Sequence, residues 1–124
     1  MGRLLIAHRA GNDLKLLSQA FAVGVDYAEA DVWLYRKRLE VRHDKIAGLL
    51  PLLWDRWSLR PGWKPRLVLS QVVRAAAGRG KLYLDLKGEE QALPAVLTAE
   101  LKLMGVSGMS FSSPVWWYLD ELKP

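Results

Sequence analysis

The stretch that decides the fold is AEADVWLYRKRLEVRHD, residues 28 to 44. Its first half is mostly apolar, but Glu29 and Asp31 stand two positions apart within it. Because residues two apart on a β-strand point to the same face, both carboxylates share one face, while alanine, valine and leucine line the other. We expect the aliphatic face to pack under helices and the acidic face to point to the concave side of a sheet or into water.

Two carboxylates held this close repel each other, and their removal from water adds to the cost. Either one of them takes up a proton or a cation lies between them, and a cation is the simpler explanation. Hard divalent cations such as Mg²⁺ and Ca²⁺ bind oxygen ligands of this kind. We therefore expect Glu29 and Asp31 to contribute to a divalent-metal site.

The second half of the stretch brings a histidine back toward these acids. If Arg36, Lys37 and Arg38 form the turn, the two strands pair so that His43 lies opposite Asp31. The turn lacks the glycine that such turns favour, so the pairing could be displaced by one residue. In either register we expect His43 to lie near the two carboxylates.

Composition limits the class of protein. The chain has 124 residues, enough for one domain with a core but too few for two. It has no cysteine, which excludes disulfides and thiolate metal sites and fits a reducing compartment. The apolar run before His8 is too short for a signal peptide, and no later run reaches the length of a membrane span, so we predict a cytoplasmic protein without a transmembrane segment. The net charge of +5 favours anionic partners such as phosphates, lipid headgroups or nucleic acids.

Short apolar runs alternate with helical patterns along the chain. Strands are predicted over 3–8, 26–35, 81–87 and 107–113. Helices are predicted after Asn12 or Asp13, over 70–77 with Ser70 as the cap, from Pro94 to Gly105, and from Pro114 to about Leu122. This order indicates βαβ units and a parallel sheet.

Residues 49–66 differ from the rest, because they hold three prolines, three tryptophans and several cations. We predict a loop, inserted after the 26–43 hairpin, whose tryptophans pack over one end of the sheet. The alternative is a lid that contacts an amphiphilic phosphate substrate or the surface of a membrane as a peripheral protein. The sequence leaves both open.

Polar residues recur toward the carboxyl ends of the apolar strands. KLYLDLK, residues 81–87, carries Asp85 and Lys87 on one face, and the first strand ends in His8 and Arg9. In (β/α) barrels the loops at that end of the strands converge on one mouth, where active sites form. Any one of these residues alone is more often structural, but their joint placement at one rim favours a site.

The ordered motifs resemble the glycerophosphodiester phosphodiesterase family. AHRAGN (7–12) is similar to the family's His-Arg-Gly motif with its later Asn, YAEADV (27–32) to its Glu-x-Asp strand, VRHD (41–44) to its His-Asp, LYLDLKG (82–88) to its Glu-x-Lys strand, and GMSFSS (108–113) with LDELKP (119–124) to its Ser-Phe strand and following helix. The resemblance covers the whole chain in the family's order. It implies an α/β fold of the TIM-type (β/α)8 barrel family, with residues 1–124 supplying about the first four β/α units, a half-barrel.

The resemblance also implies a function: metal-dependent hydrolysis of glycerophosphodiesters to an alcohol and glycerol phosphate. The family's roles fall on seven residues: Glu29, Asp31 and Asp85 as ligands of a divalent cation, Mg²⁺ or Ca²⁺; His8 and His43 as general acid and base; and Arg9 and Lys87 as phosphate-binding groups.

Three departures from the family qualify this interpretation. Ala10 replaces the motif's glycine within a shortened first loop, and Asp85 replaces a glutamate. A complete barrel needs about 250 residues, about twice this length. We therefore expect either a fragment of a longer protein or a half-barrel that self-associates through its open edges, and the chain alone could be inactive.

Two other functions compete with hydrolysis. The first is a non-catalytic module of the same fold that binds a phosphate or a lipid headgroup. The second is a basic nucleic-acid binder, suggested by the charge and six tryptophans. The tryptophans cluster in one loop and near the C-terminus rather than on a basic helix or an aromatic sheet face, so we expect a small-molecule substrate and no nucleic acid.

Overall fold

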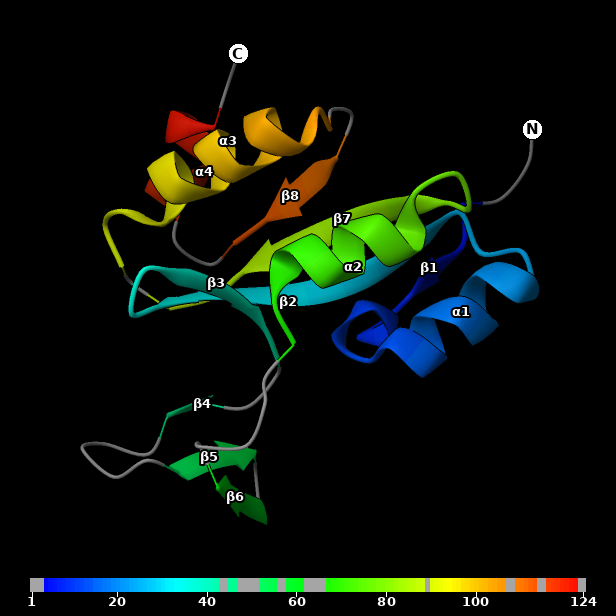
Figure 1. Cartoon of the computed structure of the whole chain (residues 1–124), viewed down its shortest axis with the longest axis horizontal. Helices are drawn as coiled ribbons and strands as arrows, with labels where there is room; N and C mark the ends of the chain where they lie inside the picture. The colour runs from blue at the N-terminus through cyan, green and yellow to red at the C-terminus, as the bar shows by residue number, and fades with distance from the viewer. Residues whose placement is uncertain are drawn as a thin grey trace.

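The computed structural model describes residues 4–42, 45–46, 52–55, 58–61, 67–88, 90–106, 109–113 and 116–122. Its main sheet contains parallel strands in the order β1-β2-β7-β8, with β3 paired antiparallel to β2 (Figure 1). The strands are β1 (Ile6–Ala7), β2 (Tyr27–Tyr35), β3 (Arg38–Val41), β7 (Lys81–Leu86) and β8 (Ser110–Ser112). The helices are η1 (Ala10–Asn12), α1 (Leu14–Ala22), α2 (Leu69–Ala76), α3 (Leu93–Met104) and α4 (Trp116–Glu121).

Each parallel strand is followed along the chain by a helix. The pairs are β1 with α1, β2 with α2, β7 with α3, and β8 with α4. Neighbouring strands run parallel in chain order, and Figure 1 shows α2 lying across β2 and β7. This is the order of the first four units of a (β/α)8 barrel.

Apolar and polar side chains alternate along β2 and β7, and the apolar ones form the core, as the sequence predicts. Ala28, Ala30 and Val32 are fully buried, and Leu82, Leu84 and Leu86 are their register partners on β7. The same hydrophobic cluster takes in the buried helix residues Leu17, Phe21, Val72, Val73, Leu97 and Leu101. A buried leucine removed from such a core costs about 2–5 kcal/mol of stability. The opposite face of the two strands carries the polar side chains of the candidate site.

Helix ends follow the sequence signals at some positions and not at others. The Asp13 carboxylate accepts hydrogen bonds from the Lys15 and Leu16 amides at 2.8 and 3.1 Å and caps α1, as predicted. Gly105 ends α3 in the left-handed conformation at φ 67°. The expectation that Ser70 caps the second helix is wrong, because α2 begins at Leu69 and its N-cap is Val68. The Gln71 side chain accepts a hydrogen bond from the Val68 backbone amide at 3.0 Å.

The β2–β3 hairpin has a tighter turn than the sequence suggests. Tyr35 pairs with Arg38, so Arg36 and Lys37 alone form the turn. Both adopt positive φ, 48° and 64°, which matches the twist of a two-residue hairpin despite the absence of glycine. The pairing is therefore displaced by one residue from the expected one.

A second, three-stranded sheet follows the hairpin. It consists of β4 (Lys45–Ile46), β5 (Leu52–Asp55) and β6 (Ser58–Pro61), in antiparallel order. The predicted insertion at 49–66 thus contains two short strands, and its other residues lie outside the described ranges. Its packing over the sheet and its role as a lid stay predictions.

The main sheet has two open edges. In the part of the chain that the structure describes, β1 and β8 each pair with one strand of this sheet, and the apolar side chains of Leu4, Leu5 and Ile6 are exposed beside β1. None of the helices in the described ranges has the length and apolar character needed to cross a bilayer.

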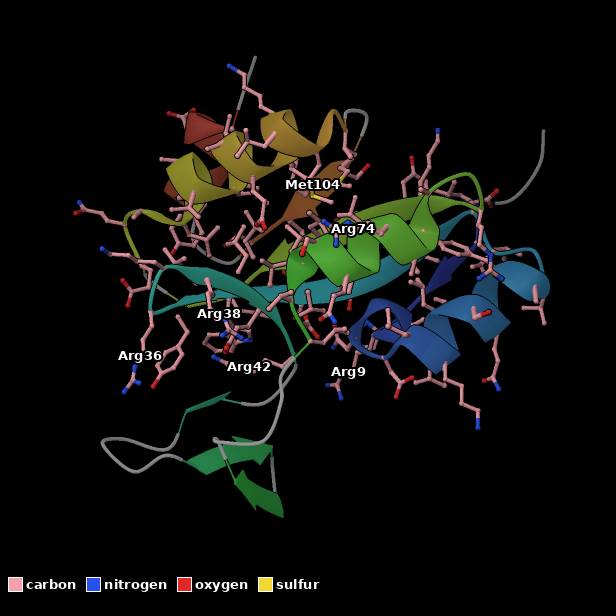
Figure 2. All side chains as sticks on the ribbon, in the orientation of Figure 1. Arg9, Arg36, Arg38, Arg42, Arg74 and Met104 are labelled. Carbon is pink, nitrogen blue, oxygen red and sulfur yellow. The ribbon has the colours of Figure 1, made fainter. Side chains whose placement is uncertain are left out.

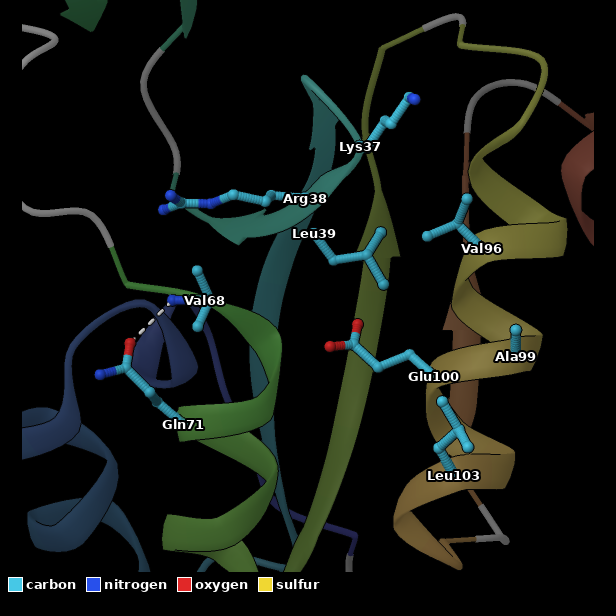
Figure 3. Close-up of a pocket in the computed structure, with 9 residues that line it drawn as sticks. All are labelled: Lys37, Arg38, Leu39, Val68, Gln71, Val96, Ala99, Glu100 and Leu103. Atoms are coloured by element: carbon cyan, nitrogen blue, oxygen red, sulfur yellow. Dashed lines mark hydrogen bonds between the residues drawn. The ribbon is translucent and has the colours of Figure 1, made fainter.

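A groove of about 780 Å³ lies between α2, α3 and the β2–β3 hairpin (Figure 3). Figure 3 shows the Glu100 side chain reaching from α3 toward Leu39, with the apolar residues Val96, Ala99 and Leu103 on the same helix. Burial raises the pKa of Glu100 above the usual glutamate range. Lys37 and Arg38 line the same groove but do not offset this burial.

Replacing Glu100 with glutamine should therefore stabilise the chain in a pH-dependent way. A raised pKa means that the folded state binds the proton more tightly, so the stability of the wild type falls as the pH rises from the ordinary glutamate range through the raised pKa. We expect Glu100→Gln to raise Tm by about 1–3 °C at pH 7 and by nothing near about pH 4. Thermal unfolding followed by circular dichroism at both pH values measures this. An equal change at the two pH values would contradict the burial argument.

Candidate active site

Three carboxylates converge at the polar face of β2 and β7. Asp31 and Asp85 occupy partner positions in the parallel register, and Glu29 precedes Asp31 by two residues on the same face. One oxygen of each carboxylate lies within 4.8 Å of the other two. The structure thus brings together the three residues expected as metal ligands.

Asp31 is held by the most complete set of hydrogen bonds in the cluster. The Asn12 side-chain amide donates to Asp31 Oδ2, and Asn12 Oδ1 accepts from the Asp31 backbone amide, both at 2.8 Å. On the same edge of β2, the Arg42 amide donates to the Asp31 carbonyl at 3.0 Å. Asp31 is 1% exposed, so these partners replace the water that the group has lost.

Asp85 is positioned by a neighbouring strand and by a lysine. The Ser112 hydroxyl of β8 donates to Asp85 Oδ1 at 3.0 Å, and Lys87 Nζ lies 2.7 Å from Asp85 Oδ2 and 3.6 Å from Asp31 Oδ1. Burial acts to lower the pKa of Lys87, but the hydrogen bond and charge of Asp85, with the charges of Asp31 and Glu29, outweigh it and raise that pKa. Lys87 is therefore a firmly protonated cation in this cluster.

His8 and Arg9 follow β1 at the same rim. His8 Nδ1 lies 2.8 Å from Glu29 Oε1, and the His8 side chain is 71% exposed. Arg9 adopts the left-handed conformation at φ 60°, which is uncommon for a residue with a side chain. Its Nε is buried and has no hydrogen-bond partner within the described ranges (Arg9 is labelled in Figure 2).

Gly11 lets the first loop approach β2 closely. A Cβ atom at this position would lie 2.7 Å from Ala30 Cβ and 2.9 Å from the Glu29 carbonyl oxygen. Any larger residue would push η1 away from the strand and move the Asn12 amide off Asp31. The shortened loop with Ala10 in place of the expected glycine thus keeps a glycine where contact with the strand requires it.

His43 falls outside the described residues, so its predicted place near the acids stays a prediction. In the observed register its neighbour Arg42 lies beside Asp31. The Arg42 guanidinium forms a buried ion pair with Glu40 at 3.0 Å and lies 4.9 Å from the centre of the Trp33 ring (Figure 2). Trp33 shares the face of Asp31 and donates from Nε1 to the Arg42 carbonyl at 2.9 Å.

Four residues next to the acids were not among the predicted site residues: Asn12, Ser112, Trp33 and Arg42. Asn12 and Ser112 bind the ligand carboxylates through single hydrogen bonds from other units of the fold. Both residues fall within motifs that resemble the family, AHRAGN and GMSFSS, but the motifs do not say which carboxylate either side chain contacts. The even spacing of Trp33 from Asp31 puts it on the acidic face of β2, but nothing in that spacing indicates a contact with Arg42.

The carboxylate cluster fits a divalent cation. Its donor set is all oxygen, which hard cations such as Mg²⁺ and Ca²⁺ prefer. Glu29 Oε1 is buried, and despite the short approach of His8 Nδ1 it accepts no hydrogen bond of good geometry from the described residues. An oxygen left in that state is available to a metal ion.

Solved structures of glycerophosphodiester phosphodiesterases share this fold. The glycerophosphoryl diester phosphodiesterase domain of a Mycobacterium tuberculosis protein matches 98% of the chain at 22% identity with a TM-score of 0.72, and the chain covers 56% of it. The glycerophosphodiester phosphodiesterase from Agrobacterium tumefaciens matches 98% of the chain at 20% identity with a TM-score of 0.70, and the chain covers 61% of it. The glycerophosphodiester phosphodiesterase from Parabacteroides distasonis matches 87% of the chain at 24% identity with a TM-score of 0.65, and the chain covers 55% of it.

These comparisons confirm the predicted fold. The chain has the α/β architecture of these (β/α)8 barrels and spans between 55% and 61% of the three solved chains, which agrees with a half-barrel. No protein-family model matches the sequence, and no curated protein is significantly similar to it. The likeness to solved structures establishes the fold, and the resemblance seen in the motifs is confirmed at that level.

Removing the Asn12 side chain should destabilise the chain through Asp31. Asn12→Ala leaves Asp31 Oδ2 and the Asp31 amide without their partners, which costs about 1–3 kcal/mol for a buried polar group. We expect a fall in Tm of about 3–10 °C in the presence of a chelator. Gln19→Ala, an exposed change on α1, is the matched control and should stay within about 0.5 kcal/mol of wild type. Equal Tm values for the two variants would show that Asn12 does not hold Asp31.

Proposed function

We propose that this chain carries the metal site of a phosphodiesterase that hydrolyses glycerophosphodiesters to an alcohol and glycerol phosphate. The observation that carries the proposal is the convergence of Glu29, Asp31 and Asp85 within 4.8 Å, with Lys87 and His8 at the same rim. The fold shared with glycerophosphodiester phosphodiesterases supports it. Because the chain spans little more than half of those proteins, its activity alone is part of the proposal.

In this proposal the three carboxylates hold Mg²⁺ or Ca²⁺. When bound, the cation polarises a phosphoryl oxygen and lowers the pKa of a bound nucleophile. The carboxylates on β2 and β7 are fixed by the sheet and by Asn12 and Ser112, which sets the position of the ion before substrate arrives. Asp85 would hold the cation with a side chain one methylene shorter than the glutamate of the family motif.

Arg9 and Lys87 are the groups that bind the phosphodiester. The Arg9 guanidinium offers a planar fork for two phosphate oxygens, and its buried Nε has no protein partner among the described residues. Lys87 adds a point charge at the carboxyl end of β7.

His8 and His43 exchange protons with the reacting oxygens. His8 Nδ1 lies 2.8 Å from Glu29 Oε1, so the imidazole stands at the rim beside the carboxylates, and its side chain is 71% exposed to an approaching substrate. One imidazole accepts a proton from the attacking water or hydroxyl, and the other donates a proton to the departing alkoxide. Each transfer of this kind contributes roughly 10²–10⁴-fold to the rate.

The proposal is tested by hydrolysis of glycerophosphocholine with and without chelator. We expect product that depends on added Mg²⁺ or Ca²⁺ and falls by about 10²–10⁴-fold in His8→Ala and in His43→Ala. Lys37→Ala, an exposed change in the hairpin turn, should retain the wild-type rate. Metal binding without product would instead identify the non-catalytic phosphate- or headgroup-binding module. The absence of both metal binding and product would refute the proposal.

We also propose that the open edges of the half-barrel pair with a second copy of the chain. Strands β1 and β8 end the strand order among the described residues, and an unpaired strand edge is a template for another chain. Exposed apolar side chains lie along β1, with Ile6 46% exposed. Eight parallel strands from two copies would close the barrel and cover these residues.

Light scattering tests this association. We expect dimers for the wild type and a shift toward monomers for Ile6→Lys, because a charge at a strand edge opposes pairing. Val23→Lys, an apolar-to-charged change at a residue just after α1 that is 80% exposed, is the control and should leave the dimer intact. A stable wild-type monomer at all concentrations would rule out this interface.

A further inference from the structure

The Lys87 ammonium lies where the proposed function places a metal ion. Its Nζ is 2.7 Å from Asp85 Oδ2 and 3.6 Å from Asp31 Oδ1, and the side chain is only 28% exposed. The family resemblance gives this lysine a role toward phosphate, but the ion pairs that its ammonium makes with the described residues are with carboxylates. Its position therefore requires a separate explanation.

The oxygens of the cluster divide into two groups. Asp31 Oδ2 is held by the Asn12 amide, and Asp85 Oδ1 is held by the Ser112 hydroxyl. The other oxygen of each carboxylate, Asp31 Oδ1 and Asp85 Oδ2, faces Lys87. The neutral donors thus fix one oxygen of each aspartate, and the ammonium lies against the two oxygens that remain for a cation.

A dication and an ammonium cannot share these oxygens at such distances. Two positive charges about 3–4 Å apart repel each other, and most strongly where they are partly buried, whereas the carboxylates attract either one. The Lys87 backbone is fixed, because its amide donates to the Val32 carbonyl at 2.8 Å. A displacement of the ammonium would therefore have to come from rotation of the flexible four-carbon side chain.

We propose, on the basis of the proposed function, that Lys87 is an internal counter-ion that holds the carboxylate cluster together without metal and must leave Asp85 when a divalent cation binds. The displaced ammonium then points into the mouth beside the ion, where a phosphate would meet it. The same lysine therefore stabilises the empty site and binds the anion in the loaded one. This coupling makes the metal a requirement for phosphate binding by Lys87.

Calorimetric titration with Mg²⁺ and with Ca²⁺ tests the competition. Lys87→Met removes the ammonium while keeping an unbranched side chain that is one atom shorter, so we expect it to bind the cation at least about tenfold more tightly than wild type. The matched control is Lys81→Met, an exposed lysine at the other end of β7, which should bind as wild type does. Lys87→Gln serves as a second neutral variant if the methionine form does not fold.

Chemical labelling of wild-type lysines separates displacement from distant charge repulsion. Repulsion alone would leave Lys87 in place, whereas displacement exposes it. We expect acetylation of Lys87, followed by mass spectrometry, to become faster on saturation with the cation and slower again when inorganic phosphate is added. Lys81 in the same sample provides the internal reference.

The outcomes separate this inference from the function on which it rests. Tighter binding by Lys87→Met together with faster labelling of Lys87 in metal supports it. Equal or weaker binding by Lys87→Met, or labelling that metal leaves unchanged, overturns the counter-ion role and leaves the metal site standing. If neither the wild type nor Lys87→Met binds a divalent cation, both the inference and the proposed function fail.

Discussion

Electrostatic repulsion between carboxylates is the constraint on which the site depends. The register of β2 and β7 sets Asp31 and Asp85 side by side, and Asp31 is almost completely buried, so water relieves neither the repulsion nor the loss of hydration. Hydrogen bonds from Asn12 and Ser112 offset part of this cost, but neutral donors do not cancel charge. The cluster therefore requires a cation, and the Lys87 ammonium supplies one in the structure described.

The rigid and the accessible parts of the site come from different elements. The three carboxylates lie on strands whose other face is packed into the core, which fixes them well enough to set the geometry of an ion. His8 and Arg9 follow the last residue of β1 instead, and His8 is mostly exposed. This division suits a reaction in which the ion must stay in place while proton donors and acceptors meet a substrate from solvent.

The sequence predicts the features that follow from the alternation of apolar and polar residues or from a residue that caps a helix. Alternation on β2 correctly separates the alanines from the acids, and Asp13 and Gly105 correctly mark helix ends. The hairpin register could not be predicted, because it depends on Arg36 and Lys37 adopting a left-handed backbone that their side chains disfavour. The Asn12 and Ser112 contacts were missed because they join different β/α units, and no spacing rule links them to the aspartates.

Ala30 is a residue of the buried core that also affects the position of the carboxylate site. Strand β1 ends at Ala7, which pairs with Ala28, so the next part of this edge of β2 has no strand beside it until β3 begins. The Asn12 side chain fills that interval, bonding the Asp31 amide as a neighbouring strand would. It can reach there because Gly11 and Ala30 are both small enough for η1 to rest on the strand. The run of small residues on the buried face of β2 is thus as necessary to the carboxylate site as the acids on its other face.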